Sequence, residues 1–355
     1  MAQPKININF RDAAATVDRR SGQGIVAVIL FDETASVQGM NVLTAASEIP
    51  AAMSDSNKAY LETIFVGNVT RPSKVYAYVL DDGETAYTDA LAELSKYNFD
   101  WIVGDPAATN TLATSLATWV RTQRDTYGRV YKAVVPNTAA DDYAVVNFTA
   151  TNIQVGEDTF TTAEYCGRIA GILAGTPLSE STTYAILPEI TDVDRLSIED
   201  ADDAEEAGEL VILFDGMKAK LGRGVTSMTT VGTNSAQLKK IKILQVRDLI
   251  DYDLKVLCED NYIGKVANDY DGKNLLISSI LDYFKGLENA DILQPGSRCE
   301  IDVAAQRAYL VAKGVDVSKM TEQEIKEADT DEKVFLNAFV GILDAIEDIT
   351  LNIAF

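Results

Sequence analysis

The stretch Ile25-Val26-Ala27-Val28-Ile29-Leu30 is continuously apolar. Such a run is typical of a strand that is buried on both faces, as in a parallel sheet covered by helices. From here the chain alternates strand-like and helix-like segments, which predicts βαβ units on a mostly parallel sheet with flanking helices. We expect further strands at 74–80, 99–103, 131–135 and 210–214, and helices at 43–53, 57–66, 86–96, 107–127 and 161–174.

Two groups of small residues lie near these predicted elements. Gly22-Gln23-Gly24-Ile25-Val26-Ala27 superficially fits a dinucleotide-binding pattern, but it precedes a strand, whereas that fingerprint must follow a strand and open a helix. We therefore reject the cofactor interpretation. In the helix expected at 161–174, small side chains allow a neighbouring element to approach closely. These residues are Ala170, Gly171, Ala174 and Gly175.

The character of the chain changes after about residue 235, where the βαβ alternation ends. We expect helices at 238–261, 275–287, 304–313 and 321–328, the last opened by Thr321 and Glu324 in capping-box spacing. Residues 333–343 satisfy either period, and their Val, Phe and Ile content favours a strand. The predicted organisation is an arm at 1–24, an α/β outer domain at 25–235, an α+β inner domain at 236–348 and a terminal strand at 349–355.

Composition narrows the possible functions of this 355-residue chain. Its formal net charge of −23 repels nucleic acid and anionic membranes, so neither is expected as a partner. The first residues lack the basic and apolar regions of a signal peptide, and no apolar run is long enough to span a bilayer. We therefore expect a soluble protein that is made inside the cell. Three cysteines, Cys166, Cys258 and Cys299, form no CxxC pair and indicate small buried side chains in a reducing compartment.

Catalytic and cofactor motifs are missing from the sequence. The chain has no histidine, which removes the commonest general base, the Ser-His-Asp triad and most zinc sites. Neither the phosphate-binding GxxxxGK[ST] loop nor the GxSxG nucleophile motif occurs. Asp200, Asp202 and Asp203 could ligate a divalent ion, but the twelve-residue calcium-loop pattern is absent. We predict no catalytic residue, no cofactor and no metal.

Two neighbouring segments carry opposite charge. The acidic block, residues 189–209, holds ten acids and one arginine, whereas the basic block, residues 216–247, holds seven basic residues and no acid. Each block alone fits a solvated face, but together they are candidate complementary surfaces. The candidate residues are Glu199, Asp200, Asp202, Asp203, Glu205 and Glu206 in the acidic block, and Lys218, Lys220, Arg223, Lys239, Lys240 and Lys242 in the basic block.

Both ends of the chain alternate apolar and other residues with the period of a strand. One interpretation places both as ordinary strands of one intramolecular sheet. The other is exchange of strands between copies of the chain, since a terminal strand presents free backbone groups along an edge. The residues concerned are Ile6, Asn7, Ile8, Asn9 and Phe10 at one end, and Ile349, Thr350, Leu351, Asn352, Ile353, Ala354 and Phe355 at the other.

Four stretches, in order along residues 160–355, resemble the contractile phage tail sheath family, in particular the short sheath proteins of simple myophages and phage-tail-like bacteriocins. They are a small-residue helix at 165–175, Gly222-Arg223-Gly224-Val225-Thr226-Ser227-Met228-Thr229-Thr230, Ile301-Asp302-Val303-Ala304-Ala305-Gln306-Arg307, and Asp344-Ala345-Ile346-Glu347-Asp348-Ile349-Thr350-Leu351-Asn352-Ile353. The second is similar to the family's GRGVNSLTT stretch, from which Thr226 and Met228 depart. Residues 1–150 match mainly in layout.

The resemblance implies a structural subunit and no enzyme. Family members form stacked hexameric rings around a tail tube, meet baseplate and tail terminator proteins, and contract to drive the tube through a cell envelope. The resemblance also implies that Ile6–Phe10 and Ile349–Phe355 complete a sheet in a neighbouring subunit, and that the protein is assembled in the bacterial cytoplasm into a virion or tail-like particle. The alternatives are an α/β enzyme that uses carboxylate chemistry, or a self-assembling interaction protein of another kind.

Overall fold

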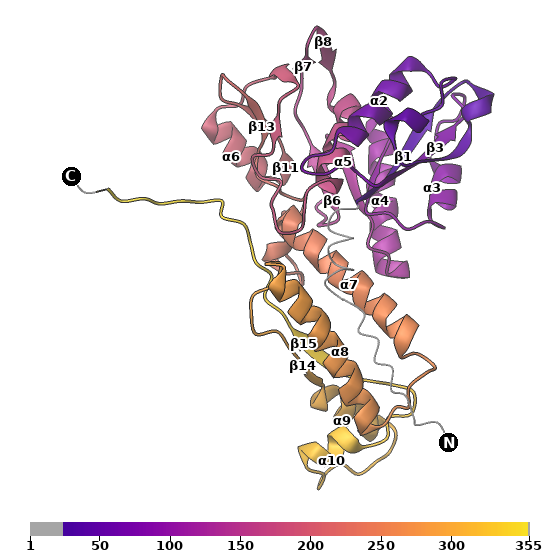
Figure 1. The fold of residues 1–355 in the computed structure, drawn as a ribbon, viewed down its shortest axis with the longest axis vertical. Coiled ribbons are helices and arrows are strands. Elements are labelled where there is room, and N and C mark those ends of the chain that lie inside the picture. The colour runs from indigo at the N-terminus through magenta and orange to yellow at the C-terminus, as the bar shows by residue number, and fades with distance from the viewer. Residues whose placement is uncertain (1–23, 354–355) are drawn as a thin grey trace, which may run out of the picture. The chain divides into compact units, whose positions relative to one another are not determined.

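The structure is a computed structural model that describes residues 24–353 and divides them into two compact units. The first unit holds residues 24–249 together with 344–353, and the second holds residues 250–343. The division lies inside the long helix α7 (Ile241–Asn261), whereas the sequence places the change of character near residue 235. The units are described separately, with elements labelled as in Figure 1.

A seven-stranded sheet forms the centre of the first unit, in the order β11-β6-β5-β4-β1-β3-β2. All neighbouring strands are parallel except β2 and β3, which are antiparallel at one edge. The predicted mostly parallel α/β fold is therefore confirmed. The strands are β1 (Ile25–Phe31), β2 (Gly39–Leu43), β3 (Lys74–Leu80), β4 (Trp101–Val103), β5 (Lys132–Pro136), β6 (Val145–Phe148) and β11 (Glu209–Leu210).

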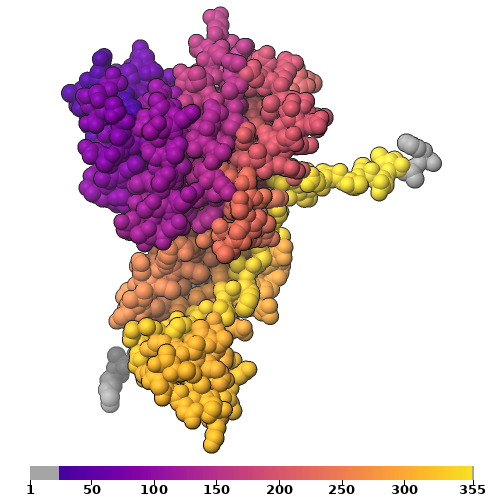
Figure 2. Space-filling model, turned by 180° about the vertical axis from the view of Figure 1, so that it is seen from behind, coloured from indigo at the N-terminus to yellow at the C-terminus, as the bar shows by residue number. Residues whose placement is uncertain are grey.

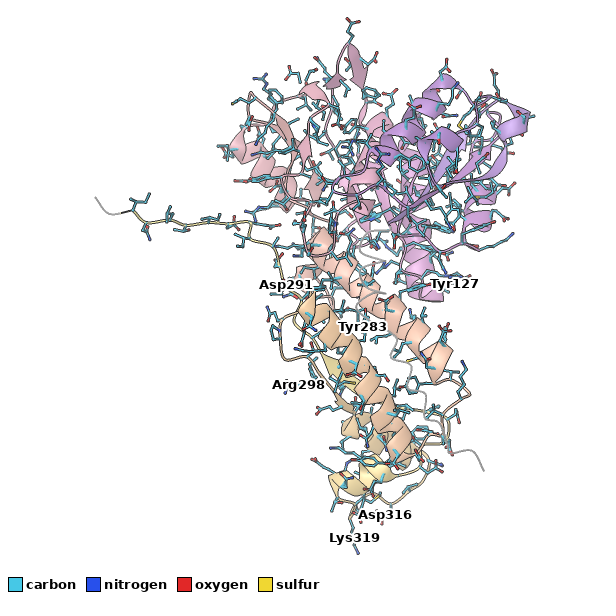
Figure 3. All side chains as sticks on the ribbon, viewed as in Figure 1. Tyr127, Tyr283, Asp291, Arg298, Asp316 and Lys319 are labelled. Carbon is cyan, nitrogen blue, oxygen red and sulfur yellow. The ribbon has the colours of Figure 1, made fainter. Side chains whose placement is uncertain are left out.

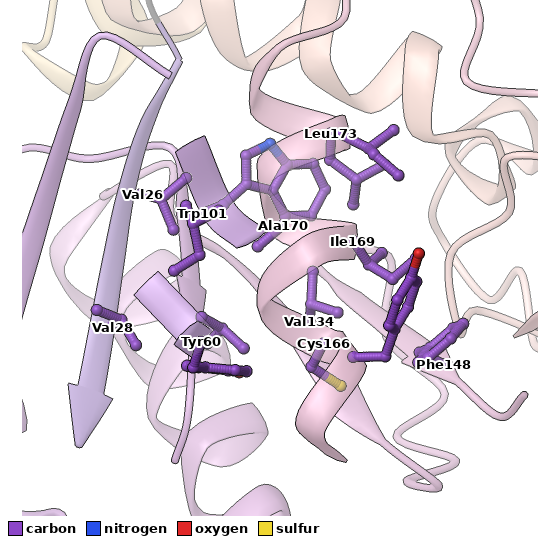
Figure 4. Close-up of a cluster of buried hydrophobic side chains, with 14 of the residues drawn as sticks. Val26, Val28, Tyr60, Trp101, Val134, Phe148, Cys166, Ile169, Ala170 and Leu173 are labelled. Atoms are coloured by element: carbon purple, nitrogen blue, oxygen red, sulfur yellow. The ribbon is translucent and has the colours of Figure 1, made fainter. Parts of the chain in front are cut away.

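Helices cover both faces of this sheet. Alternate residues of β1 point to opposite faces, so Val26 and Val28 pack with α2 and α5, whereas Ala27 and Ile29 pack with α3 and α4. Figure 4 shows the first of these cores, where α5 lies over the sheet. Burial on both faces, predicted from the apolar run, is confirmed. The helices are α2 (Asp55–Val66), α3 (Thr88–Leu94), α4 (Asn110–Tyr127) and α5 (Thr162–Ala174).

Glycines let α5 pack closely against its neighbours, as the sequence predicts. A Cβ added to Gly171 would lie 2.3 Å from the backbone oxygen of Ile64 in α2. A Cβ on Gly24 would lie 2.1 Å from the backbone oxygen of Ala174 at the end of α5. Gly24 is therefore needed for packing where β1 begins, which agrees with the rejection of a cofactor motif.

Two predicted elements of this unit differ from the structure. The helix predicted at 43–53 is wrong: β2 ends at Leu43 and only a short 3-10 turn, Ala46–Glu48, follows. Pro50 explains this, because the residue before a proline is disfavoured in the helical conformation. The strand predicted at 210–214 is split at Val211, whose carbonyl accepts a hydrogen bond from Gly222 N. As a result β11 and β12 (Ile212–Phe214) join different sheets.

Two small sheets and an acidic helix complete the first unit. The sheets have three strands each, in the orders β10-β7-β8 and β12-β13-β9. Their added elements are β7 (Ile153–Val155), β8 (Asp158–Phe160), β9 (Ile186–Leu187), β10 (Ile190–Asp192) and β13 (Ala219–Leu221), and the acidic helix is α6 (Ile198–Glu206).

The second unit is α+β, and it contains the later part of α7. A two-stranded antiparallel sheet pairs β14 (Arg298–Ile301) with β15 (Leu336–Phe339), so residues 333–343 contain a strand as predicted. The capping box of Thr321 and Glu324 is present at the start of α10. The helices are α8 (Tyr270–Asn289), α9 (Val303–Ala312) and α10 (Glu322–Glu327).

Candidate functional site

The C-terminal segment 349–353, hereafter the terminal segment, is exposed. Ile349, Leu351 and Ile353 have exposed fractions of 82%, 76% and 68%. The segment has no assigned secondary structure and pairs with no strand of the described chain. It extends away from the folded part of its unit (Figure 1, Figure 2). Ile6–Phe10, the arm at 11–23, Ala354 and Phe355 lie outside the described residues.

Residues 344–348, hereafter the connector, are bound to the first unit by ion pairs and hydrogen bonds. Glu347 is the best protected of them, because its side chain is only 9% exposed. Its Oε1 accepts hydrogen bonds from Thr183 Oγ1 at 2.7 Å and Ser181 Oγ at 3.1 Å, and its Oε2 accepts from Lys240 Nζ at 3.0 Å. Two separate parts of the chain, residues 181–183 and Lys240, thus supply donors to one carboxylate.

The two flanking carboxylates of the connector are also paired. Asp348 accepts hydrogen bonds from both terminal nitrogens of Arg223, at 2.5 and 3.2 Å. Asp344 accepts a hydrogen bond from Lys240 Nζ at 2.5 Å. The hydrogen bond from Arg223 lowers the pKa of Asp348. Burial opposes the charge of Lys240, but its hydrogen bonds to Asp344 and Glu347 outweigh burial and raise the pKa of Lys240. These contacts favour the charged forms of Asp348 and Lys240.

Arg223 is presented by the GRG sequence at 222–224, whose glycines are needed for packing. A Cβ on Gly222 would lie 2.6 Å from Glu205 Oε1, and one on Gly224 would lie 2.6 Å from Thr182 Oγ1. Glu205 Oε1 accepts a hydrogen bond from the Arg223 backbone N at 2.7 Å. Burial raises the pKa of Glu205, and the contacts with Arg223 offset this only in part. The acidic and basic blocks therefore meet within one chain at Glu205 and Arg223.

The other charged residues of the acidic and basic blocks differ from one another in exposure and in contacts. Lys220 lies 4.1 Å from the ring centre of Tyr184, and Lys242 is buried and donates to the carbonyl of Ser179. Burial lowers the pKa of Lys242, and its position inside the unit makes it unsuitable for a surface between subunits. Lys239 is half-buried. The exposed candidates are Glu199, Asp200, Asp202, Asp203 and Glu206 on α6, and Lys218 in the turn before β13.

The two-stranded sheet of the second unit has edges that no other described strand covers. One face of it is apolar, with Cys299 and Ile301 buried on the side that packs with α8. On the other face, Arg298 (labelled in Figure 3) lies 5.4 Å from the ring centre of Phe339, which is 48% exposed. A two-stranded sheet is marginally stable alone and gains from further strands.

The carboxyl ends of the parallel strands, where α/β enzymes bind substrates, hold carboxylates with structural roles. Asp105, just after β4, accepts hydrogen bonds from the backbone N of Phe31 and of Ala107, both at 2.8 Å. Asp32, just after β1, accepts from Ser54 N at 2.9 Å and Asn57 Nδ2 at 3.0 Å. Burial raises the pKa of Asp105, whereas hydrogen bonds keep that of Asp32 low despite burial. Both side chains tie loops to the sheet.

A buried charge cluster, which we call the Asp248 cluster, holds the first half of α7 in the first unit. Arg124 pairs with Asp248 through two hydrogen bonds at 2.6 and 2.9 Å, and Lys132 Nζ lies 3.2 Å from the same carboxylate. These three side chains are at most 5% exposed. Burial opposes ionisation, but Lys132 and Arg124 lower the pKa of Asp248. Sequence reasoning misses this cluster because Asp248 lies more than a hundred positions from both of its partners.

Between residues 24 and 353, no group of three or more Cys, Asp or Glu side chains is arranged to hold a metal ion. No helix in that range is long and apolar enough to cross a membrane.

Comparisons with known proteins identify the family. The family model "Phage tail sheath protein central domain" matches residues 83–227, and "Phage tail sheath C-terminal domain" matches residues 233–355. The tail sheath protein of Clostridium phage phiCD119 is 35% identical over 355 residues, covering 98% of this chain and 98% of that protein. The chain belongs to the phage tail sheath family. It is therefore a structural tail sheath protein of a phage or phage-like particle, and not an enzyme.

Solved structures of tail sheath proteins have the same fold. The sheath tail protein of Listeria innocua superposes with a TM-score of 0.70 at 14% identity, covering 92% of this chain and 98% of that chain. The contracted helical sheath of the anti-feeding prophage gives a TM-score of 0.67 at 14% identity and covers 100% of this chain and 99% of that chain. The family resemblance inferred from four short stretches is thus confirmed.

Proposed function

We propose that this sheath protein is the repeating subunit of a contractile tail sheath. Copies polymerise as stacked hexameric rings around a tail tube, and contraction drives the tube through a cell envelope. The fold shared with a contracted helical sheath and with a baseplate of the anti-feeding prophage supports the proposal. The partners are further copies of the chain, the tube protein, and the baseplate and terminator proteins. Assembly takes place in the bacterial cytoplasm and yields a virion or a tail-like particle.

One observation carries the proposal: the chain has both an exposed strand-like segment and a two-stranded sheet whose edges no other strand within residues 24–353 covers. The terminal segment places Ile349, Leu351 and Ile353 in an alternating apolar row. The sheet β14–β15 has an apolar face and can accept added strands. We propose that the terminal segment of one copy, and Ile6–Phe10 of another, pair with this sheet in a third. Because each copy both donates and accepts, the contacts are head-to-tail and build an open helical assembly.

Burial of the apolar row gives this exchange its driving force. Moving an exposed Ile or Leu side chain into an apolar environment contributes about 1.5–3 kcal/mol. Three such side chains in each copy, added to new backbone hydrogen bonds, offset the loss of freedom of the segment. Backbone pairing depends little on side-chain identity, so it can survive rotation of the domains during contraction. In this arrangement the first unit, which includes the connector, forms the outer domain, and residues 250–343 belong to the inner domain.

The charge blocks have a proposed role in contraction. We propose that the exposed carboxylates of α6 approach the basic block of a neighbouring subunit more closely after contraction than before it. Lys218 is exposed and fits this role, whereas Arg223 and Lys240 already bind the connector. Salt screens exposed charges, so the contracted lattice should weaken at high salt. Equal resistance of the contracted lattice at low and high salt would exclude this role.

Negative-stain microscopy of the purified protein tests the proposed function. Full-length protein should form tubes, whereas variants lacking residues 1–20 or 350–355 should remain folded and unassembled. Leu351→Asp with Asn352→Asp as its control is a sharper comparison, because both add one charge but only Leu351 belongs to the apolar row. We expect tubes from Asn352→Asp and none from Leu351→Asp. Normal tubes from both would exclude strand exchange by the terminal segment.

A further inference from the structure

We propose that Ser181, Thr183, Arg223 and Lys240 form a binding site for the acidic connector of the same chain, hereafter the connector cradle. Docking of Glu347 in the cradle fixes the point from which the terminal segment leaves its unit. The proposal rests on the proposed function only in taking the terminal segment to be a strand that is exchanged. Docking itself is a property of the single chain.

The hydroxyl groups of the cradle are oriented toward the carboxylate by the surrounding backbone. Thr183 Oγ1 accepts a hydrogen bond from Gly224 N at 3.0 Å, and Ser181 Oγ accepts from Thr183 N at 3.2 Å. A hydroxyl that accepts from a fixed backbone N–H remains available to donate its own proton. Thr183 donates to Glu347 Oε1 at 2.7 Å. The cradle is therefore formed by backbone geometry and does not depend on flexible side chains alone.

The contacts differ in strength according to their exposure. Arg223 and Asp348 have side chains that are 41% and 76% exposed, and such surface pairs contribute little to stability. Glu347 is 9% exposed and receives three donors, one of them charged. Hydrogen bonds to charged groups are stronger than neutral ones, and a buried carboxylate without partners is costly. Glu347 is thus the anchor of the connector, and the flanking pairs guide it.

Docking matters because Asp348 directly precedes the terminal segment. A free flexible chain of the connector's length has a root-mean-square end-to-end distance of about 12 Å. Docking fixes the position of the connector, so only the terminal segment with its apolar row remains free to bind a partner. Pre-organisation of this kind favours binding by reducing the freedom lost on association. The GRG sequence, which lies in one of the four stretches that resemble the family, has a physical role because it presents Arg223 to the connector.

Distance measurements between spin labels test this inference in a Leu351→Asp background, which we expect to remain monomeric. The labels are placed at Ser36→Cys, exposed in the first unit, and at Ile346→Cys, exposed in the connector, in a Cys258→Ser background; Cys166 and Cys299 are buried. With the cradle intact, double electron–electron resonance should give one narrow distribution. Glu347→Gln removes the charge at constant shape, and should broaden the distribution by an amount on the order of 10 Å.

Two further variants make the outcome decisive. Glu33→Gln removes one exposed charge from the same unit and should leave the distribution unchanged. Lys240→Gln removes the cation instead of the carboxylate and should broaden the distribution as Glu347→Gln does. If both cradle variants keep the narrow distribution, the cradle is wrong. Because the experiment uses monomers, failure of the protein to form tubes leaves this result unaffected and counts only against the proposed function.

Discussion

Neutralising Asp248 should destabilise the first unit strongly. In Asp248→Asn the side chain keeps its size, but Arg124 and Lys132 lose their buried counter-charge. Arg124 would keep its hydrogen bond to the Tyr131 carbonyl at 3.0 Å and Lys132 its contact with the Val130 carbonyl at 3.3 Å. Neither contact replaces a carboxylate, because the two cations then repel each other in a buried site.

The magnitude follows from the burial of these side chains. Removing one partner of a buried ion pair typically costs about 3–5 kcal/mol. For a domain of this size, each kcal/mol lowers the unfolding temperature by about 2–4 °C. The expected decrease in the unfolding temperature of the first unit is therefore about 6–20 °C. That loss is a large part of the total stability of a typical domain.

Thermal unfolding followed by circular dichroism measures this effect, with urea unfolding as an independent check. Asp251→Asn is a matched control on the same helix, because Asp251 pairs with Lys255 at the surface, with side chains 44% and 48% exposed. That pair is worth about 0.3–0.5 kcal/mol. A loss from Asp248→Asn no larger than that from Asp251→Asn would refute the reasoning that the Asp248 cluster holds α7 in the first unit.

Three further predictions concern packing, capping and pH. Gly171→Ala should lower the free energy of unfolding by about 1–3 kcal/mol in urea titrations, because its Cβ would meet the Ile64 carbonyl; an unchanged midpoint would contradict this. Thr321→Ala should cost the second unit about 1 kcal/mol through loss of the capping box, measured in the same way. Asp348 has a lowered pKa, so its contribution to docking is complete above its ordinary value of 3.8 and is lost as pH falls through the lower value. Asp348→Asn at pH 6 should mimic the loss of this charge in strong acid and, because the pair is exposed, should broaden the spin-label distribution less than Glu347→Gln does; an equal broadening would contradict Glu347 as the anchor.

Sequence patterns predicted the central sheet well because short stretches of sequence determine which strands are buried and how closely the helices pack. The apolar run at Ile25–Phe31 determines burial on both faces, and the small residues of α5 determine how closely α2 approaches. Predictions failed where a longer-range contact decides the structure. The hydrogen bond from Gly222 N to the Val211 carbonyl lies between the end of β11 and the start of β12. The alternation of apolar residues in the sequence does not reveal this bond.

The candidate site was predictable only in part, for the same reason. The alternation of apolar residues indicated the terminal segment as a candidate, and the structure shows that its apolar side chains are exposed. The cradle was not predictable, because Ser181 and Thr183 lie 166 and 164 positions before Glu347. Arg223 and Lys240 were candidates for a surface complementary to the acidic block, yet within the chain they bind the connector. Charge runs therefore indicate that partners exist without identifying them.

Cryo-electron microscopy of tubes assembled from the full chain tests the central claim most directly. If this sheath protein assembles by strand exchange, residues 349–355 of one copy will pair through backbone hydrogen bonds with an edge of β14 or β15 in a different copy. The claim is contradicted if those residues fold back onto a sheet of their own chain, or if the edges of β14 and β15 stay uncovered in the assembled tube.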